Sequence, residues 1–297
     1  MKRLKPFSYV EPSTLQEAIQ GAAEKEGGTC FLAGGTDLLV RMKRGEILPR
    51  SLVNLKRIKG LNQIEREPKE GLRIGALARI SEIEHSPRVA SSHPVLVQAA
   101  GLLGSPSIRN LATLGGNVGR ASPASDLTPS LMVLRARVSV EGPQGRKELA
   151  VEQLFLEPGK TLLSPAEVMT SFFIPEMAPN TGAIYLKLGR RSAVDCALVG
   201  VAALLTLSGK KMEATEANIA LASVGPVPLR AQRAEGILLS GSLTEERIKE
   251  AARAAAEDAS PITDMRASSS YRKEMVKVLT YRALLKALHQ AQGEETT

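Results

Sequence analysis

The spacing of apolar and polar residues along the chain predicts alternating helices and strands, arranged in three consecutive units. In the first unit, residues 1–56, Ser13 and Gln16 form a capping-box pattern at the start of a helix, which Gly27-Gly28 is expected to end. Short apolar runs predict the other elements of this βαβ-like unit: a strand at 30–33, a helical turn at 38–43 and a strand at 51–55.

The second unit, residues 57–176, combines runs of both periodicities. The predicted elements are a strand at 71–77, helices at 79–86, 94–103 and 127–134, and strands at 136–142 and 167–175. Glycine and other turn residues are so frequent in 113–126 that neither a helix nor a strand is expected there.

In the third unit, residues 177–297, strands precede helices. Strand-like runs occur at 182–189, 196–209 and 216–225, and helical patterns at 245–258 and 270–288. This order predicts an α+β domain in which helices cover a three-stranded antiparallel sheet. The last residues, 293–297, are expected to be frayed.

Composition narrows the class of protein. A chain of 297 residues that is 43% hydrophobic can form two or three domains with real cores. Its two cysteines, Cys30 and Cys196, are too few for a disulfide framework or for a cysteine-held iron–sulfur cluster. No apolar stretch reaches membrane-helix length and no signal peptide precedes the first unit, so we expect a cytoplasmic protein with no membrane span.

The net charge of +8 raises the question of a nucleic-acid partner. Lysine and arginine are interleaved with glutamate, and aromatic residues make up only 3% of the chain, so few side chains could stack on bases. We therefore expect no nucleic-acid binding. An acidic partner subunit or a polyanionic cofactor fits this charge equally well.

Two glycine-rich turns could carry chemistry: the first turn, residues 33–37, and the second turn, residues 113–117. Backbone N–H groups without a Cβ nearby suit a phosphate oxygen, and two such turns together could hold a pyrophosphate from both sides. The alternative is that each is an ordinary tight turn. The chain lacks G-x-G-x-x-G, and its partial P-loop at 154–161 has Leu154 in place of the first glycine, which indicates a chance match.

Several polar side chains near these turns have two interpretations. Ser125 and Asp126 could cap the following helix, or Asp126 could accept a hydrogen bond from a ribityl or ribose hydroxyl. Arg109 could brace the second turn, contact a phosphate or be solvated. Tyr185 and Lys187 alternate on a strand, where they could be a packed aromatic and a surface charge, or could lie beside a flavin ring.

Residues for acid–base, nucleophilic or metal chemistry are scarce. His85, His93 and His289 are not spaced as metal ligands, and no G-x-S-x-G motif is present. We therefore expect no catalytic residues and no metal site on this chain, and a cofactor that carries the reaction.

The motifs resemble those of the FAD-binding medium subunit of the molybdenum hydroxylases, a family that includes carbon monoxide dehydrogenase, xanthine dehydrogenase, nicotinate dehydrogenase and 4-hydroxybenzoyl-CoA reductase. The resemblance runs in order along nearly the whole chain. It is carried by FLAGGTDLLVRMKRG at 31–45, LRIGALARISEIE at 72–84, IRNLATLGGNVGRASPASDLTPSLMVL at 108–134 and YLKLGRRSAVDCALVGVAA at 185–203.

The resemblance implies a vanillyl-alcohol-oxidase, or PCMH-type, FAD-binding fold. Two α/β subdomains, residues 1–56 and 57–176, would enclose FAD, and residues 177–297 would form the α+β domain found at the C-terminus of carbon monoxide dehydrogenase flavoproteins. Both glycine turns would hold the pyrophosphate, Asp126 matches an acidic residue of the family, and Lys187 matches a flavin-side lysine. The implied cofactor-binding residues are Phe31, Leu32, Ala33, Gly34, Gly35, Thr36, Asp37, Leu38, Leu103, Thr113, Leu114, Gly115, Gly116, Asn117, Ser125, Asp126, Met169, Tyr185 and Lys187.

The resemblance also implies an electron-transfer role in a heterotrimer, or a dimer of heterotrimers. FAD would receive electrons from 2Fe-2S clusters on a small subunit, which takes them from molybdopterin on a large subunit, and would pass them to NAD or a quinone. Alternatives are a self-sufficient flavoenzyme of this fold, a medium subunit of a CoA-thioester aromatic reductase running in reverse, and a non-catalytic phosphate-ligand binder. Some of those reductases carry an inserted Cys-rich loop; no cysteine lies between the second turn and residue 175, which weakens that alternative.

Overall fold

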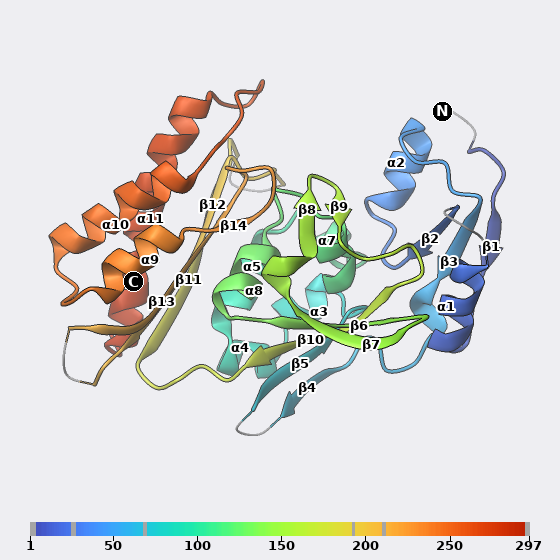
Figure 1. The fold of residues 1–297 in the computed structure, drawn as a ribbon, viewed down its shortest axis with the longest axis horizontal. Helices are drawn as coiled ribbons and strands as arrows, with labels where there is room; N and C mark the ends of the chain where they lie inside the picture. Colours follow the sequence, from blue (N-terminus) through green and yellow to red (C-terminus); the bar gives the residue numbers. More distant parts are fainter. Residues whose placement is uncertain (1–3, 25–27, 68–69, 192–193, 210–211, 295–297) are drawn as a thin grey trace.

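The computed structural model describes residues 4–24, 28–67, 70–191, 194–209 and 212–294. Gly27, expected to end the first helix, and residues 295–297 of the expected frayed tail lie outside these ranges. Figure 1 shows three sheets in a row, with the N-terminal sheet on the right and the C-terminal sheet, with its helices, on the left.

The N-terminal lobe, which we define as residues 4–57 where described, contains a parallel three-stranded sheet in the order β1-β3-β2. Its first helix begins one residue later than predicted, because the hydroxyl of Thr14 accepts the N–H of Glu17 and the Glu17 carboxylate accepts the N–H of Ser13. Strand β1 was not predicted. The elements are β1 (Ser8–Val10), α1 (Leu15–Ala23), β2 (Thr29–Leu32), α2 (Leu38–Arg44), β3 (Ser51–Asn54) and the 3-10 helix η1 (Leu55–Arg57).

The second unit is built on an antiparallel five-stranded sheet in the order β4-β5-β10-β6-β7. Helices and a small hairpin connect its strands. The elements are β4 (Ile64–Glu67), β5 (Gly71–Gly75), α3 (Ile80–Glu84), α4 (Pro87–Ser92), α5 (Pro94–Leu102), α6 (Pro106–Arg109), α7 (Leu114–Gly119), α8 (Leu127–Val133), β6 (Arg137–Gly142), β7 (Gly145–Ala150), η2 (Val151–Leu154), β8 (Phe155–Glu157), β9 (Lys160–Thr161) and β10 (Val168–Pro175).

Helix α7 corrects the expectation that 113–126 holds no helix. The hydroxyl of Thr113 accepts the N–H of Gly116 at 3.1 Å and so caps the helix. A Cβ on Gly115 would lie 2.8 Å from the Cβ of Ala76. Close packing on the end of β5 therefore requires glycine in a helix that glycine would otherwise disfavour.

The P-loop-like stretch 154–161 folds as the β8–β9 hairpin, not as a strand, phosphate loop and helix. Its turn residue Gly159 has φ +81° and donates its N–H to the carbonyl of Ala121 at 2.9 Å. The glycine therefore serves the tight turn of a hairpin.

The C-terminal domain contains an antiparallel sheet in the order β11-β12-β13-β14, one strand more than predicted. The extra strand, β14, has two residues, too few to produce an alternating pattern. Helix α9 was also not predicted. The elements are β11 (Thr181–Leu188), β12 (Val199–Leu207), β13 (Ala214–Ala222), β14 (Leu229–Arg230), α9 (Gln232–Leu239), α10 (Glu245–Asp258) and α11 (Ser269–Ala291).

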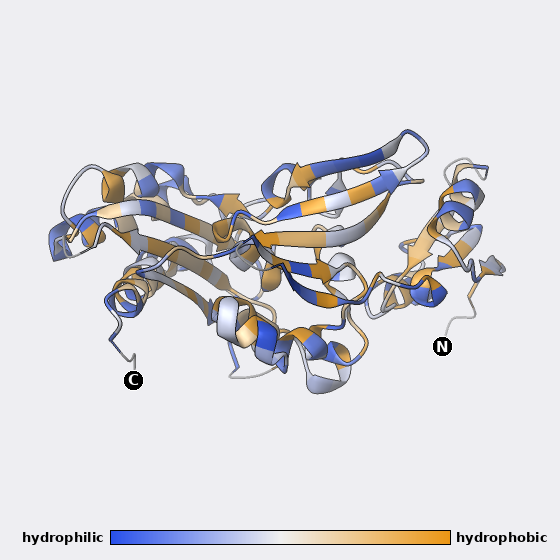
Figure 2. Cartoon of the chain, turned by 90° about the horizontal axis from the view of Figure 1, so that it is seen from below, coloured by the Kyte–Doolittle hydropathy of each residue, from blue (hydrophilic) through white to orange (hydrophobic). Residues whose placement is uncertain are grey.

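The C-terminal sheet is buried on both faces. One face, which includes Val201 and Ile219, packs on α9, α10 and α11. The other face, which includes Ala202 and Leu204, joins the core of the second unit through α5 and α8. In Figure 2 the strands carry long hydrophobic stretches, as burial on both sides requires.

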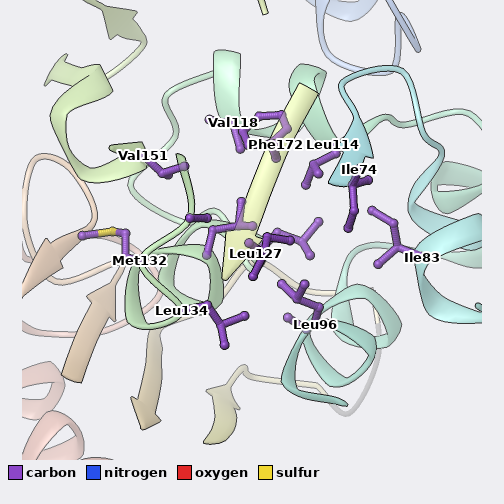
Figure 3. Close-up of a cluster of buried hydrophobic side chains, with 14 of the residues drawn as sticks. Ile74, Ile83, Leu96, Leu114, Val118, Leu127, Met132, Leu134, Val151 and Phe172 are labelled. Carbon is purple, nitrogen blue, oxygen red and sulfur yellow. The ribbon is translucent and has the colours of Figure 1, made fainter. Parts of the chain in front are cut away.

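The core of the second unit gathers between its sheet and its helices. Figure 3 shows Phe172 of β10 beside Leu114 and Val118 of α7, with Leu127 of α8 and Leu96 of α5 in the same cluster. A separate, smaller cluster around Ala18, Val53 and Leu55 of the N-terminal lobe also includes Leu61 and Val168 of the second unit. Within the described ranges, no helix combines the length and apolarity needed to cross a membrane.

Candidate functional site

A cavity of about 520 Å³ lies between the N-terminal lobe and the second unit. Residues of β2, α2, α7 and β9 line it, and Figure 1 shows where these elements lie in the fold. Cavities of roughly 300–1,000 Å³ are typical of small-molecule and cofactor sites. Of the residues predicted to bind a cofactor, those that line it are Phe31, Ala33, Gly34, Gly35, Thr36, Asp37, Leu38, Leu103, Gly115, Gly116, Asn117 and Met169. Leu32, Thr113, Leu114, Ser125, Asp126, Tyr185 and Lys187 are not part of the lining.

The first turn presents its backbone to this cavity. Gly35 has φ +76°, a conformation that favours glycine, and a Cβ on Gly34 would overlap the carbonyl oxygen of Leu111. Among the described residues, the N–H groups of Gly35, Thr36 and Asp37 donate to no protein acceptor. These N–H groups can therefore receive the oxygens of an anion.

The second turn differs from the expectation that both turns expose their N–H groups. Leu114 and Gly115 donate theirs to the carbonyls of Ala78 and Ala76, and Gly116 donates to the hydroxyl of Thr113. The N–H groups of Leu114, Gly115 and Gly116 are therefore already used in hydrogen bonds within the protein and are not available to a phosphate. Its glycines instead form a wall without side chains, close enough to the first turn that a Cβ on Gly116 would lie 3.9 Å from the Cβ of Ala33.

Charged side chains surround the first turn. Asp37 lies at the cavity rim, with the Nε of Arg120 at 2.9 Å from its carboxylate and Nη1 of Arg41 at 3.8 Å. Neither arginine was predicted, although both line the cavity. The position of Arg120 directly after the glycine-rich segment was the available signal.

Asp126 forms a buried ion pair with Lys187. The ammonium of Lys187 donates to Oδ2 of Asp126 at 2.9 Å and to the carbonyl of Leu102 at 2.9 Å, and the hydroxyl of Tyr185 donates to Oδ1 at 2.8 Å. Burial raises the pKa of Asp126, and the Lys187 ammonium opposes that shift. Burial and the Asp126 carboxylate both raise the pKa of Tyr185.

This arrangement corrects two of the sequence interpretations. Asp126 precedes α8 but makes no side-chain cap; the hydroxyl of Ser125 accepts the N–H of Thr128 instead. Lys187 is not a surface charge, because its side chain is only 8% exposed. The ion pair joins the start of α8 to β11 of the C-terminal domain, next to Leu103 in the cavity lining.

Arg109 braces the structure and is not solvated. It donates two hydrogen bonds to the carboxylate of Glu84, at 2.6 and 3.0 Å, and a third to the carbonyl of Leu103 at 3.1 Å. It therefore holds the backbone next to a cavity-lining side chain.

Other lining residues were not predicted. The stretch between β9 and β10 contributes the largest group, and β2, η1, α6 and β9 contribute others. These residues include Cys30, Leu55, Ile108, Thr161, Leu163, Ser164, Pro165 and Glu167. Within the described ranges, no cluster of three or more His, Cys, Asp or Glu side chains could hold a metal ion.

Two protein families match the chain in succession. Residues 5–177 match the FAD binding domain in molybdopterin dehydrogenase, and residues 184–287 match the carbon monoxide dehydrogenase flavoprotein C-terminal domain. The carbon monoxide dehydrogenase medium chain of Hydrogenophaga pseudoflava is 33% identical, over 94% of this chain and 96% of that one. The alpha subunit of the 6-hydroxypseudooxynicotine dehydrogenase complex of Paenarthrobacter nicotinovorans is 29% identical, over 96% of this chain and 95% of that one.

Solved structures of similar proteins superpose on this chain along nearly its whole length. Carbon monoxide dehydrogenase from Hydrogenophaga pseudoflava superposes with a TM-score of 0.92 at 33% identity, covering 96% of this chain and 98% of that chain. Quinoline 2-oxidoreductase from Pseudomonas putida 86 gives a TM-score of 0.89 at 28% identity, covering 98% of this chain and 99% of that chain.

Proposed function

Because this chain belongs to the family of FAD-binding medium subunits of the molybdopterin-dependent dehydrogenases, we propose that the cavity beside the first turn is its FAD site. The chain is an oxidoreductase subunit with an FAD-binding domain, and the partner subunits of this family carry molybdopterin and iron–sulfur clusters. The observation that supports the location most directly is that, in the described part of the chain, the N–H groups of Gly35, Thr36 and Asp37 have no protein acceptor, while all three residues line a cavity of cofactor size.

The diphosphate of FAD would lie on the first turn. Hydrogen bonds from neutral donors to a charged group contribute roughly 1.5–3 kcal/mol each, more than hydrogen bonds between neutral groups. The glycine wall of the second turn, Gly115 and Gly116, would let the ligand approach the backbone closely. Asn117 lines the same cavity and is held there by the hydroxyl of Ser125, which donates to its Oδ1 at 2.7 Å.

The flavin ring would lie toward Leu103 and Met169, two of the apolar residues of the lining. Lys187 is fixed nearby by Asp126 and by the carbonyl of Leu102, so its ammonium would supply a fixed positive charge at this end. Tyr185 acts one step further away, because its hydroxyl holds Asp126.

The role that follows is electron transfer within a complex of three kinds of subunit. FAD supplies the chemistry that links single-electron transfer from iron–sulfur clusters to the two-electron reduction of an acceptor. We propose a heterotrimer, or a dimer of heterotrimers, in which NAD or a quinone is that acceptor. Residues 1–56 and 57–176 would bind FAD, and residues 177–297 would form the third domain.

A pair of glycine variants tests the FAD site. Gly35 and Gly45 have nearly equal φ, +76° and +77°, so an aspartate costs similar backbone strain at either position. Of these two glycines, Gly35 lines the cavity and Gly45 does not. In a titration followed by flavin fluorescence, Gly35→Asp should lose FAD binding and Gly45→Asp should keep it. Equal FAD affinity in both variants would show that the first turn does not hold the cofactor.

The acceptor is tested on the complete complex. The purified complex, reduced with its substrate, is mixed with NAD or with a soluble quinone, and reoxidation is followed by flavin absorbance. We expect rapid reoxidation by one of the two. Slow reoxidation by both would contradict the proposed acceptors.

A further inference from the structure

Arg120 joins two parts of the molecule across the cavity rim. It follows α7 in the second unit, and its Nε lies 2.9 Å from Oδ1 of Asp37, which belongs to the N-terminal lobe. Both side chains line the cavity. We call this contact the rim ion pair.

A third chain segment packs on the same guanidinium group. The turn of the β8–β9 hairpin is held by the hydrogen bond from Gly159 to the carbonyl of Ala121. A Cβ on Gly159 would lie 3.2 Å from Nη1 of Arg120. Arg120 therefore lies between the hairpin and the first turn, and its side chain is 32% exposed.

The carboxylates that line the cavity are already paired. Asp37 is shared between Arg120 and Arg41, and Glu167 pairs with Lys147. The unpaired N–H groups of the first turn lie in the same place. An anion bound on that turn would thus meet a rim whose own carboxylates are already neutralised.

We propose that the rim ion pair of Arg120 and Asp37 retains the bound dinucleotide by closing the N-terminal lobe onto the second unit. This inference rests on the proposed FAD site. Arg120 acts here as a positioning residue, since it holds Asp37 and the hairpin turn in place around the ligand. Asp37, at the end of the first turn, transmits that restraint to the N–H groups on which the diphosphate would lie.

The test is the rate at which the purified complex releases FAD after dilution, followed by flavin fluorescence. Arg120→Gln should release FAD about tenfold faster than the wild type, because a charge-assisted bridge across the rim is lost. Arg44→Gln is the matched control. It also removes a guanidinium from the N-terminal lobe, but Arg44 does not line the cavity. It is 69% exposed and, among the described residues, its ion pair is with Glu46 of the same lobe, so the FAD release rate should not change.

A second variant separates closure from simple charge attraction. Asp37→Asn removes a negative charge beside the diphosphate, so attraction alone would make it release FAD more slowly than the wild type. If the rim ion pair closes the site, Asp37→Asn should release FAD faster. It also provides the test should Arg120→Gln fail to fold.

The salt dependence gives an independent readout. Salt screens a partly exposed ion pair, so 0.5 M sodium chloride should speed FAD release from the wild type and have less effect on Arg120→Gln. Equal release from Arg120→Gln and Arg44→Gln, or slower release from Asp37→Asn, would overturn the inference and leave the FAD site standing. A wild-type complex that holds no FAD would overturn the proposed function itself.

Discussion

At the residue scale, the buried pair of Asp126 and Lys187 shows which part of a site can be predicted from sequence motifs. The resemblance identified both residues, but neither their contact nor the hydroxyl of Tyr185 could be predicted, because they come from segments about sixty residues apart that only the tertiary fold brings together. The same holds for Arg120, whose partner Asp37 belongs to another lobe. By contrast, the turn at Gly35 was predictable, since this glycine acts through its local backbone conformation.

Removal of Asp126 should cost more than the loss of a helix cap. Asp126→Ala leaves the Lys187 ammonium buried without its carboxylate, which costs about 3–5 kcal/mol of unfolding free energy, whereas a lost cap costs about 1 kcal/mol. Urea unfolding measures the difference. The double variant Asp126→Asn with Lys187→Met should recover part of the loss, and a cost near that of a cap would contradict the importance of the pair.

His93 should make stability depend on pH. It is fully buried, with Nε2 2.9 Å from the carbonyl of Pro175, and burial lowers its pKa below the ordinary 6.5. Below about pH 6.5 the imidazole is therefore protonated in the unfolded chain but stays neutral in the folded chain, which favours unfolding. The contribution of His93 to the free energy of unfolding is thus fully present above about pH 6.5 and is lost as the pH falls.

The expected slope is at most about 1.4 kcal/mol per pH unit. Urea unfolding at several values between pH 7 and pH 5 should show a smaller loss of stability for His93→Gln than for the wild type. His85→Gln is the control for a histidine substitution outside the core, because the His85 side chain is 75% exposed.

At the scale of elements, the long periodic segments were predictable, as were short runs such as β2 and β3, whereas the shortest strands were not. The patterns at 245–258 and 270–288 correspond to α10 and α11, and the apolar run at 196–209 contains β12. Strands such as β1 and β14 are two or three residues long, so tertiary hydrogen bonds and not periodicity determine them.

Two glycines in the C-terminal domain should respond oppositely to alanine. A Cβ on Gly182 of β11 would overlap the carbonyl oxygen of Ala287 on α11, whereas a Cβ on Gly236 of α9 would meet nothing within 4 Å. Gly182→Ala should lower the unfolding free energy by about 1–3 kcal/mol or more, and Gly236→Ala should raise it by roughly 0.5–1 kcal/mol. Chemical denaturation compares them; effects of the same sign would contradict the close approach of α11 to β11.

At the scale of the whole molecule, the family resemblance predicted the fold class, the cofactor and the partner subunits, and the comparisons bear these out. The continuity of the core could not be predicted. Residues of β11, β12 and β13 join the cluster of the second unit, across the boundary expected near residue 177. An apolar sequence that forms a strand buried on both faces does not show which neighbouring element covers each face.

Added FAD should stabilise the purified chain against heat. A ligand at 100 times its dissociation constant contributes about 2.7 kcal/mol, which corresponds to a rise in Tm of roughly 4 °C for a chain of this size. Thermal unfolding followed by circular dichroism measures the shift. Gly35→Asp should show no shift at the same FAD concentration, and an unchanged wild-type Tm would contradict binding to the folded state.

The small apolar cluster around Ala18, Val53 and Leu55 has a consequence for local opening of the N-terminal lobe. Local opening is easiest where few apolar side chains are buried, so amide hydrogens of β1, β2 and β3 should exchange with solvent sooner than those of β12. A dinucleotide lying against both the lobe and the second unit would supply the interior that the lobe lacks. On that view the cofactor completes the packing of the lobe, which becomes rigid only when the dinucleotide is bound.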